Sequence, residues 1–228
     1  MSEQTRAPNS VGRHVVILSH PDPDSFNHSV ARTYCETVRG AGQEVVLRDL
    51  YAIGFDPVLK AIERPGPRHP HPLRDVADEL EIIRRSDLFV LVYPIWFGSA
   101  PAMLKGYVDR VLGTAVVPQA IQEGNPTSLL GDKTLLSFTT SGTRRVWLDE
   151  QGEQSALETV FDRYLMHAFG MREEKHVHFD HITEDLTERF AAQHLQDVKD
   201  EAERACAEVT ARSGGPLGAA ALSDRASR

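Results

Sequence analysis

Short β-rich runs alternate with longer segments of helical periodicity from residue 14 to about residue 209. Three of the runs are almost continuously apolar: HVVILS at 14–19, LFVLVY at 88–93 and TLLSFT at 134–139. Two others, EVVLR at 44–48 and KHVHF at 175–179, carry charged or polar residues. Apolar strands in alternation with helices are typical of a parallel sheet that helices cover on both faces. We therefore predict an α/β fold in which the last two runs lie nearer the sheet edges.

Apolar residues recur at three- and four-residue spacing between and after these runs, which indicates five helices. The first follows Ser25, the second includes Leu80, and the third opens at Pro101. The fourth covers residues 155–169, and the fifth runs from residue 184 to about residue 209, after Thr183 as its predicted cap. Several apolar side chains of the last two helices are expected to face inward: Val160, Phe161, Tyr164, Leu165 and Phe190.

The chain has 228 residues, enough for one large or two small domains. Because no repeat or long linker divides it, we predict a single domain over residues 13–210. The segments 1–12 and 211–228 are expected to be flexible tails. Proline-rich composition predicts connections at residues 64–72 and 117–131.

Net charge narrows the range of partners. The 25 Lys and Arg against 33 Asp and Glu give a formal charge of −8, which argues against nucleic acid and anionic membranes. No apolar run approaches the ~20 residues that span a bilayer, and no signal-like stretch opens the chain, so we predict a cytoplasmic location.

Cys35 and Cys206 lie far apart and are expected to be buried free thiols. We predict no metal site, because His176 and His178 lack a placed carboxylate.

The first candidate for chemistry is HPDPDSFN at residues 20–27, directly after the first predicted strand. Ligands of open α/β sheets bind outside the carboxyl ends of the strands. Here His20, Ser25, Asn27 and the opening amides of the following helix can hold a phosphate. The alternative is that Asp24 or Ser25 only caps that helix.

Two further loops follow the third and fourth predicted strands. YPIWFGSAP at 93–101 places Trp96 and Phe97 outside any core-facing period, where a flat conjugated ring or a neighbouring subunit could cover them. TTSGTRR at 139–145 is rich in hydroxyl groups, and its Gly142 lets backbone approach a ligand.

Together, HPDPDSFN, YPIWFGSAPAMLKGYVDRV and TTSG resemble the flavodoxin-like NAD(P)H:quinone oxidoreductases. That family includes the mammalian quinone reductases, their bacterial relatives and the ancillary flavoproteins of potassium efflux systems. The resemblance covers roughly residues 13–180. It implies a flavodoxin-like three-layer sandwich whose five-stranded parallel sheet has the order 2-1-3-4-5, a tightly held flavin and a homodimer.

The resemblance assigns roles to individual positions. The residues matched to the flavin phosphate are His20, Ser25, Phe26 and Asn27; those along the isoalloxazine ring are Pro94, Ile95, Trp96 and Phe97; those at its pyrimidine edge are Thr140, Ser141 and Gly142. Only Ile95 separates Pro94 from Trp96, where the family usually has two residues. Arg144, Arg145 and Trp147 stand where the family has a Tyr and a His, and either contact nicotinamide phosphate or substrate or form a solvated basic surface.

The function implied is that of a flavin-dependent NAD(P)H oxidoreductase, which passes two electrons to a quinone or similar acceptor by ping-pong hydride transfer. FMN is the favoured flavin, with FAD as the alternative, and NAD(P)H is the electron donor. No side chain is expected to act as an obligatory acid or base, because the flavin carries the chemistry. Amides of Ser141 and Gly142 would stabilise the reduced ring. Two other functions stay open: a flavodoxin-type electron carrier and a flavin-binding regulatory subunit of a cation antiporter.

Overall fold

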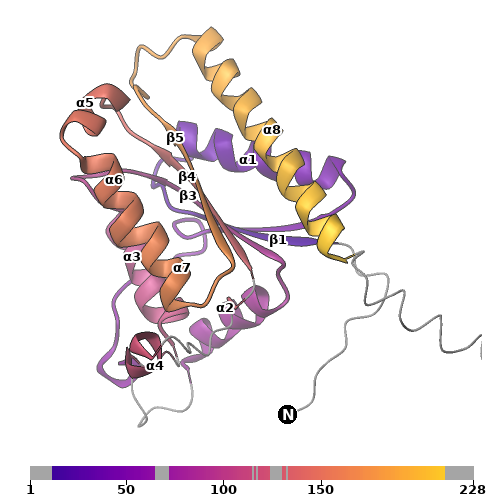
Figure 1. Cartoon of the computed structure of the whole chain (residues 1–228), viewed down its shortest axis with the longest axis vertical. Coiled ribbons are helices and arrows are strands. Elements are labelled where there is room, and N and C mark those ends of the chain that lie inside the picture. Colours follow the sequence, from indigo (N-terminus) through magenta and orange to yellow (C-terminus); the bar gives the residue numbers. More distant parts are fainter. Residues whose placement is uncertain are drawn as a thin grey trace, which may run out of the picture.

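The computed structural model describes residues 12–64, 72–114, 116, 118–123, 130, 131 and 133–213. Five parallel strands form one sheet in the order β2-β1-β3-β4-β5, which confirms the predicted fold class (Figure 1). The strands are β1 (Arg13–Leu18), β2 (Glu44–Asp49), β3 (Leu88–Pro94), β4 (Thr134–Thr140) and β5 (Glu173–Phe179). The two polar runs are the edge strands β2 and β5, as predicted.

Helices cover both faces of the sheet (Figure 1). On one face, α1 (Phe26–Gly40) and α8 (Glu188–Ser213) pack against Val16 and Leu18 of β1. On the other, Val15 and Ile17 meet α2, α3 and the helical segment that follows β4. The elements of that second face are α2 (Arg74–Arg84), α3 (Ala102–Tyr107) continuing into η2 (Val108–Leu112), and α6 (Glu153–Leu157) continuing through η3 (Glu158–Arg163) into α7 (Tyr164–Ala168).

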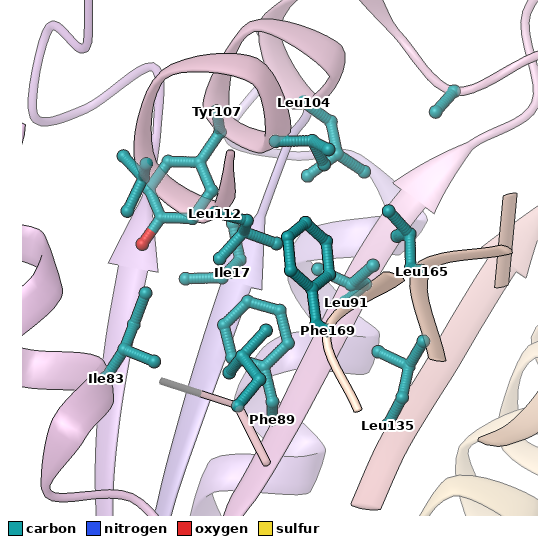
Figure 2. Packing of buried hydrophobic residues seen from close by; sticks show 14 of the residues in the cluster. Ile17, Ile83, Phe89, Leu91, Leu104, Tyr107, Leu112, Leu135, Leu165 and Phe169 are labelled. Carbon is teal, nitrogen blue, oxygen red and sulfur yellow. The ribbon is translucent and has the colours of Figure 1, made fainter. Parts of the chain in front are cut away.

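The core of the second face is built from aliphatic and aromatic side chains of strands and helices. Figure 2 shows Phe89 and Leu91 of β3 among side chains of α2, α3, η2 and α7. Leu91, Phe89 and Ile17 are completely buried. Because burying a side chain of this size contributes about 1.5–3 kcal/mol, this layer anchors the central strands whose carboxyl ends form the site described below.

The inward face predicted for the fourth helix is partly wrong. Phe161 and Leu165 are buried, but Val160 and Tyr164 are exposed to 69% and 57%. The physical reason is the π-helical turn η3, whose wider turns shift the phase of the apolar stripe. A helical period of 3.6 applied to the sequence does not anticipate such a change in phase.

The predicted start of the last helix is also wrong. The segment from 180 to 187 is a loop, in which the Thr183 hydroxyl bonds the Asp185 carboxylate, and α8 begins at Glu188. Thr187 takes the capping position, since its carbonyl accepts the N–H of Ala191. The side chain of Phe190, expected inside, is 60% exposed.

Three short helices lie where the sequence predicts connections or makes no assignment: η1 (Ala61–Glu63), α4 (Pro118–Gln122) and α5 (Arg145–Glu150). Both cysteines are buried and free, as predicted. Of the predicted tails, residue 12 is buried and residues 211–213 belong to α8, and the remainder lies outside the described residues, as do residues 65–71 of the Pro-rich connection. Within the described part of the chain, no helix combines the length and apolarity needed to cross a membrane.

The glycine at position 106, within the motif YPIWFGSAPAMLKGYVDRV, has a structural reason. A Cβ atom at this position would lie 2.3 Å from the backbone oxygen of Pro57, so α3 can pack this closely on the segment after β2 only without a side chain. We expect Gly106→Ala to lower the free energy of unfolding by about 2 kcal/mol, because such overpacking strains the backbone. Urea titration is the measurement, with Gly40→Ala as the control, since a Cβ there meets nothing within 4 Å. Equal effects of the two substitutions would disprove this explanation.

A buried histidine makes the fold sensitive to acid. His14 Nε2 lies 2.9 Å from Gln43 Oε1, and His14 Nδ1 lies 2.7 Å from the Tyr34 hydroxyl, an arrangement that suits a neutral imidazole. Burial lowers the pKa of His14 below its usual value of 6.5, and the opposing effect of Gln43 is smaller.

The unfolded chain therefore binds the proton first, so the free energy of unfolding decreases as the pH falls from 6.5 towards the lowered pKa of folded His14. Denaturant titrations at about pH 7.5 and about pH 5.5 measure the loss. In His14→Gln we expect the free energy of unfolding to differ less between the two pH values than it does in the wild type. An unchanged difference would assign the acid sensitivity to other groups.

Candidate functional site

The carboxyl ends of β1, β3 and β4 bring the predicted site residues together. Pro94 and Thr140 are partners at the ends of β3 and β4. The N–H of Ile95 donates to the Thr140 carbonyl at 2.7 Å, and Asn27 Nδ2 donates to Thr140 Oγ1 at 2.9 Å. Thr140 thus joins the loops that follow β1, β3 and β4. These loops lie at the carboxyl ends of the strands, where ligands of open α/β sheets bind.

In the loop after β1, the carboxylate of Asp22 is bonded to the backbone of the same loop. The Asp22 carboxylate accepts the N–H of Asp24 at 2.9 Å, and the Asp22 N–H donates to His20 Nδ1. Ser25 is the N-cap of α1, and its hydroxyl oxygen accepts the N–H of His28, so Ser25 is the residue that caps the helix. The next N–H groups, of Phe26 and Asn27, belong to the helical turn that has no acceptor within its own helix. They are the donors available for an anion at the positive end of α1.

His28 and Asp49 are two neighbours of this loop that the sequence analysis missed. His28 Nε2 lies 3.0 Å from Asp49 Oδ2 at the end of β2, and its Nδ1 lies 3.0 Å from the Ser25 hydroxyl. Asp49 also accepts the N–H groups of Tyr51 and Ala52, which fixes its carboxylate. His28 thereby joins the start of α1 to β2. A single histidine inside an amphipathic helix carries no sequence signal for such a role.

The aromatic loop after β3 forms a tight turn. Backbone hydrogen bonds of 3.0 and 3.1 Å join Trp96 to Ser99, and the two residues between them have positive φ: 50° at Phe97 and 72° at Gly98. Such an angle costs a bulky residue about 1–3 kcal/mol, and strained residues of this kind cluster at functional sites. The Phe97 side chain is fully exposed, and Trp96 is 40% exposed.

Trp96 also contacts the loop after β1. Its ring and that of His20 pack edge to face, with centroids 5.7 Å apart. Burial lowers the pKa of His20, so the imidazole is favoured in its neutral form. The exposed ring of Trp96 therefore stands beside the loop that leads into α1, and a ligand with both a phosphate and a flat ring could use the α1 amides and this ring together.

The loop after β4 differs from expectation in one respect. The N–H of Ser141 donates to the Phe179 carbonyl at 3.0 Å, so of the two predicted amide donors only Gly142 remains for a ligand. The Ser141 hydroxyl donates to the Thr143 carbonyl at 2.8 Å and lies 3.0 Å from His178 Nε2. The backbone of this loop is thus held from β5.

The other predicted site residues take different positions. The side chain of Phe26 packs on Phe179 and His194, so only its backbone N–H is available to an anion, and Ile95 packs partly buried on the core. Arg144 lines a cavity of about 560 Å³ beside the start of α8, with His181 and Phe190 among the other lining residues. Trp147 is half-exposed on α5, and the side chain of Arg145 lies outside the described part of the structure.

A run of buried and partly buried polar side chains, here called the β4–β5 polar chain, was not anticipated. It consists of Asp162, His176, Thr139, His178 and Ser141. The alternation of His176 and His178 on one strand shows that they share a face, but nothing in the sequence marks Asp162 of η3 as their partner.

Two buried polar atoms bear on what the site can hold. Ser19 Oγ, directly after β1, and Asn27 Oδ1, at the start of α1, are buried without a hydrogen-bond partner among the described residues. Leaving such an atom unsatisfied costs about 1–3 kcal/mol, so a bound polar ligand at this edge would be stabilised by them. The free amides, the exposed aromatic face and these orphaned atoms together fit a phosphate-bearing aromatic cofactor.

Known proteins share this fold and much of this sequence. The chain is 34% identical over 131 residues to a protein of Haemophilus influenzae named an uncharacterized NAD(P)H oxidoreductase, which covers 57% of this chain and 64% of that one. It is 31% identical over 153 residues to ribosyldihydronicotinamide dehydrogenase [quinone] of Pongo abelii, covering 58% and 65%. The matches therefore span less than two thirds of these relatives.

Solved structures with the same fold include an NAD(P)H:quinone oxidoreductase from Methanothermobacter marburgensis, with a TM-score of 0.68, 20% identity, and coverage of 85% of this chain and 95% of that chain. An FMN-dependent NADH-azoreductase from Bacillus anthracis in complex with FMN gives a TM-score of 0.62 at 15% identity, covering 86% and 100%. The model of the family Flavodoxin_2, described as having a flavodoxin-like fold, matches residues 12–203. The chain thus belongs to the Flavodoxin_2 family of flavodoxin-like proteins.

Proposed function

We propose that this protein is a flavin-dependent NAD(P)H oxidoreductase that reduces a quinone or a similar aromatic acceptor. The observation that carries the proposal is that the start of α1 and the loop after β3 are both hydrogen-bonded to Thr140 at one sheet edge, where the exposed ring of Trp96 packs on His20 of the loop leading into α1. The names of the relatives, NAD(P)H oxidoreductase and quinone dehydrogenase, support the reaction class.

FMN is the proposed cofactor, with FAD as the alternative. When bound, the flavin would take a hydride from NAD(P)H and pass two electrons on to the acceptor. The N–H groups of Phe26 and Asn27 would hold its phosphate, with His20 beside them. Trp96 would lie along the ring, and the N–H of Gly142 would donate to its pyrimidine edge. The phosphate of FMN is a terminal group, which suits the open helix terminus of α1.

The donor and the acceptor would use the same place in turn. The Trp96–Ser99 turn exposes one aromatic surface, and Phe97 projects from it into solvent. Because both the nicotinamide and a quinone are flat rings, a single stacking surface can receive either but not both. We therefore propose ping-pong exchange at one site, with Arg144 in reach of the charged part of a substrate through the neighbouring cavity.

Steady-state kinetics test this function. The protein reconstituted with FMN is assayed for NADH and NADPH oxidation with a soluble benzoquinone at several fixed quinone concentrations. Parallel double-reciprocal lines are the expected result. Absence of quinone-dependent oxidation would contradict the enzyme and favour an electron carrier. Basal rates that rise only with a co-purifying membrane protein would favour the antiporter subunit.

We also propose that the protein is a homodimer. The side chains of Val160 and Tyr164 are exposed, and they line an apolar cavity of about 520 Å³ together with Val108, Phe161 and Leu165. Exposed apolar surfaces of this kind mark interaction sites. Light scattering is expected to give a dimer mass for the wild type and a monomer mass for Val160→Glu. A monomeric wild type would refute the dimer.

A further inference from the structure

The β4–β5 polar chain connects the buried interior to the loop after β4. His178 Nε2 lies 3.0 Å from the Ser141 hydroxyl, and His178 Nδ1 lies 2.8 Å from Thr139 Oγ1. The same Thr139 oxygen lies 2.7 Å from His176 Nε2. His176 Nδ1 is hydrogen-bonded to Asp162, whose carboxylate is completely buried and also accepts from Ser137 Oγ at 2.7 Å.

The hydrogen-bond donors and acceptors of the β4–β5 polar chain can be assigned in order, starting from Ser141 at its outer end. The Ser141 hydroxyl donates to the Thr143 carbonyl, so its oxygen must accept from His178 Nε2–H. If His178 is neutral, its Nδ1 has no hydrogen and accepts the hydroxyl hydrogen of Thr139. Thr139 Oγ1 must then accept from His176 Nε2–H. One further proton therefore lies between His176 Nδ1 and Asp162.

With that proton on His176, an imidazolium stands next to an ionised Asp162, whose other oxygen accepts from Ser137, and every contact of the β4–β5 polar chain is satisfied. A second arrangement satisfies the same contacts. If the Thr139 hydroxyl turns, it donates to His176 Nε2 and accepts from His178 Nδ1–H. His176 is then neutral and His178 carries the charge. The two arrangements differ by the transfer of one proton, with no gain or loss: the His176 Nε2–H bond and the Thr139 O–H bond break, and a new Thr139 O–H bond and a His178 Nδ1–H bond form.

We propose that the β4–β5 polar chain is a proton relay that moves a positive charge from His176 to His178 when negative charge develops at the loop after β4. The inference rests on the proposed function, since the reduced flavin would supply that charge beside Ser141 and Gly142. A cation one hydrogen bond from the loop stabilises such charge strongly in a water-poor interior. Thr139, His176 and His178 act through Ser141 and are positioning residues.

Two other charged or titratable groups are close to Asp162. The first is Tyr93 of β3; burial, and secondarily the Asp162 charge, raise the pKa of Tyr93 far above its usual value, so it remains a neutral phenol. The second is Arg163, which pairs with Glu174 on β5 at 3.8 Å. On the outer side, the N–H of His181 approaches the Thr143 carbonyl.

Side-chain ¹⁵N NMR of the histidines at pH 7 tests the relay, with assignments from His176→Gln and His178→Gln. The apoprotein is expected to show an imidazolium at His176 and a neutral Nε2–H tautomer at His178. After loading with FMN and anaerobic reduction by dithionite, His178 is expected to become the imidazolium. Two neutral histidines beside a hydrogen-bonded Asp162 in every state would overturn the proposal.

Thr139→Val removes the hydroxyl that joins the two rings at nearly constant volume. We expect the preference for reduced over oxidised FMN to fall roughly tenfold, equal to a two-electron midpoint potential about 30 mV lower. Thr134→Val, the same change at the other end of β4, is the control and should leave the potential unchanged. Failure to bind either FMN or FAD would refute the proposed function and the relay with it. Binding with an unchanged His178 signal and an unchanged Thr139→Val potential would refute the relay alone.

Discussion

Replacing Glu63 by Gln is expected to lower the free energy of unfolding by about 3 kcal/mol. The Arg110 side chain is 1% exposed, and its guanidinium bonds both carboxylate oxygens of Glu63 at 2.7–3.1 Å. Burial alone would raise the pKa of Glu63, but the Arg110 guanidinium and the N–H of Lys60 together outweigh burial, and the pKa is lowered. The variant keeps the shape of Glu63, and the half-exposed Asp75, 2.8 Å away, is then the one ion-pair partner of the buried guanidinium among the described residues.

Guanidinium chloride unfolding at neutral pH measures this loss. Glu81→Gln is the matched control, because the Glu81 ion pairs with Arg84 and Arg85 are exposed. We expect Glu81→Gln to lower the free energy of unfolding by no more than about 0.5 kcal/mol. Because folding lowers the pKa of Glu63, ionised Glu63 stabilises the folded protein fully above its pKa in the unfolded chain, near 4.5. This stabilisation is lost as the pH falls through the lower pKa of Glu63 in the folded protein. A loss no larger than that of the control would show that the buried pair is not a structural anchor.

Trp96→Ala is expected to lower kcat/KM for quinone reduction roughly 100-fold while the stability changes little. The indole is 40% exposed and contacts His20 at the mouth of the site, so its removal creates no core cavity. Its loss would leave the acceptor ring without the surface that orients it. Steady-state assays give the effect on the reaction, and urea titration gives the effect on stability.

Trp96→Phe retains a flat ring on the same backbone turn and is expected to recover most of the activity. Wild-type quinone reduction by Trp96→Ala would remove this residue from the site. If Trp96→Ala lost stability and activity together, the residue would have a structural role instead.

The sheet could be predicted from the sequence because its signals are local. The continuous apolar runs of β1, β3 and β4 identify buried strands, and the charged residues of β2 and β5 identify edges. The loops after β1 and β3 could be located for the same reason, since ligands of this architecture bind where those strands end.

The features that could not be predicted from the sequence depend on contacts between segments that are distant in the chain. The π-helical turn η3 shifts the apolar stripe at Val160, and no local pattern announces it. The amide of Ser141 is engaged by Phe179, a partner that only the register of β4 and β5 reveals. Asp162 and His176 are 14 positions apart and meet because η3 lies over β5. The polar chain thus follows from tertiary packing alone.

The spectrum of the protein titrated with FMN tests the central claim most directly. The α1 amides and the exposed Trp96 ring are expected to bind one FMN per chain, with quenching of flavin and tryptophan fluorescence. NADH added without oxygen should then bleach the flavin absorbance. In Trp96→Phe the stoichiometry should be the same, with less quenching of tryptophan fluorescence. Unchanged fluorescence of FMN, and of FAD tested in parallel, at flavin concentrations well above those of the protein would contradict the account.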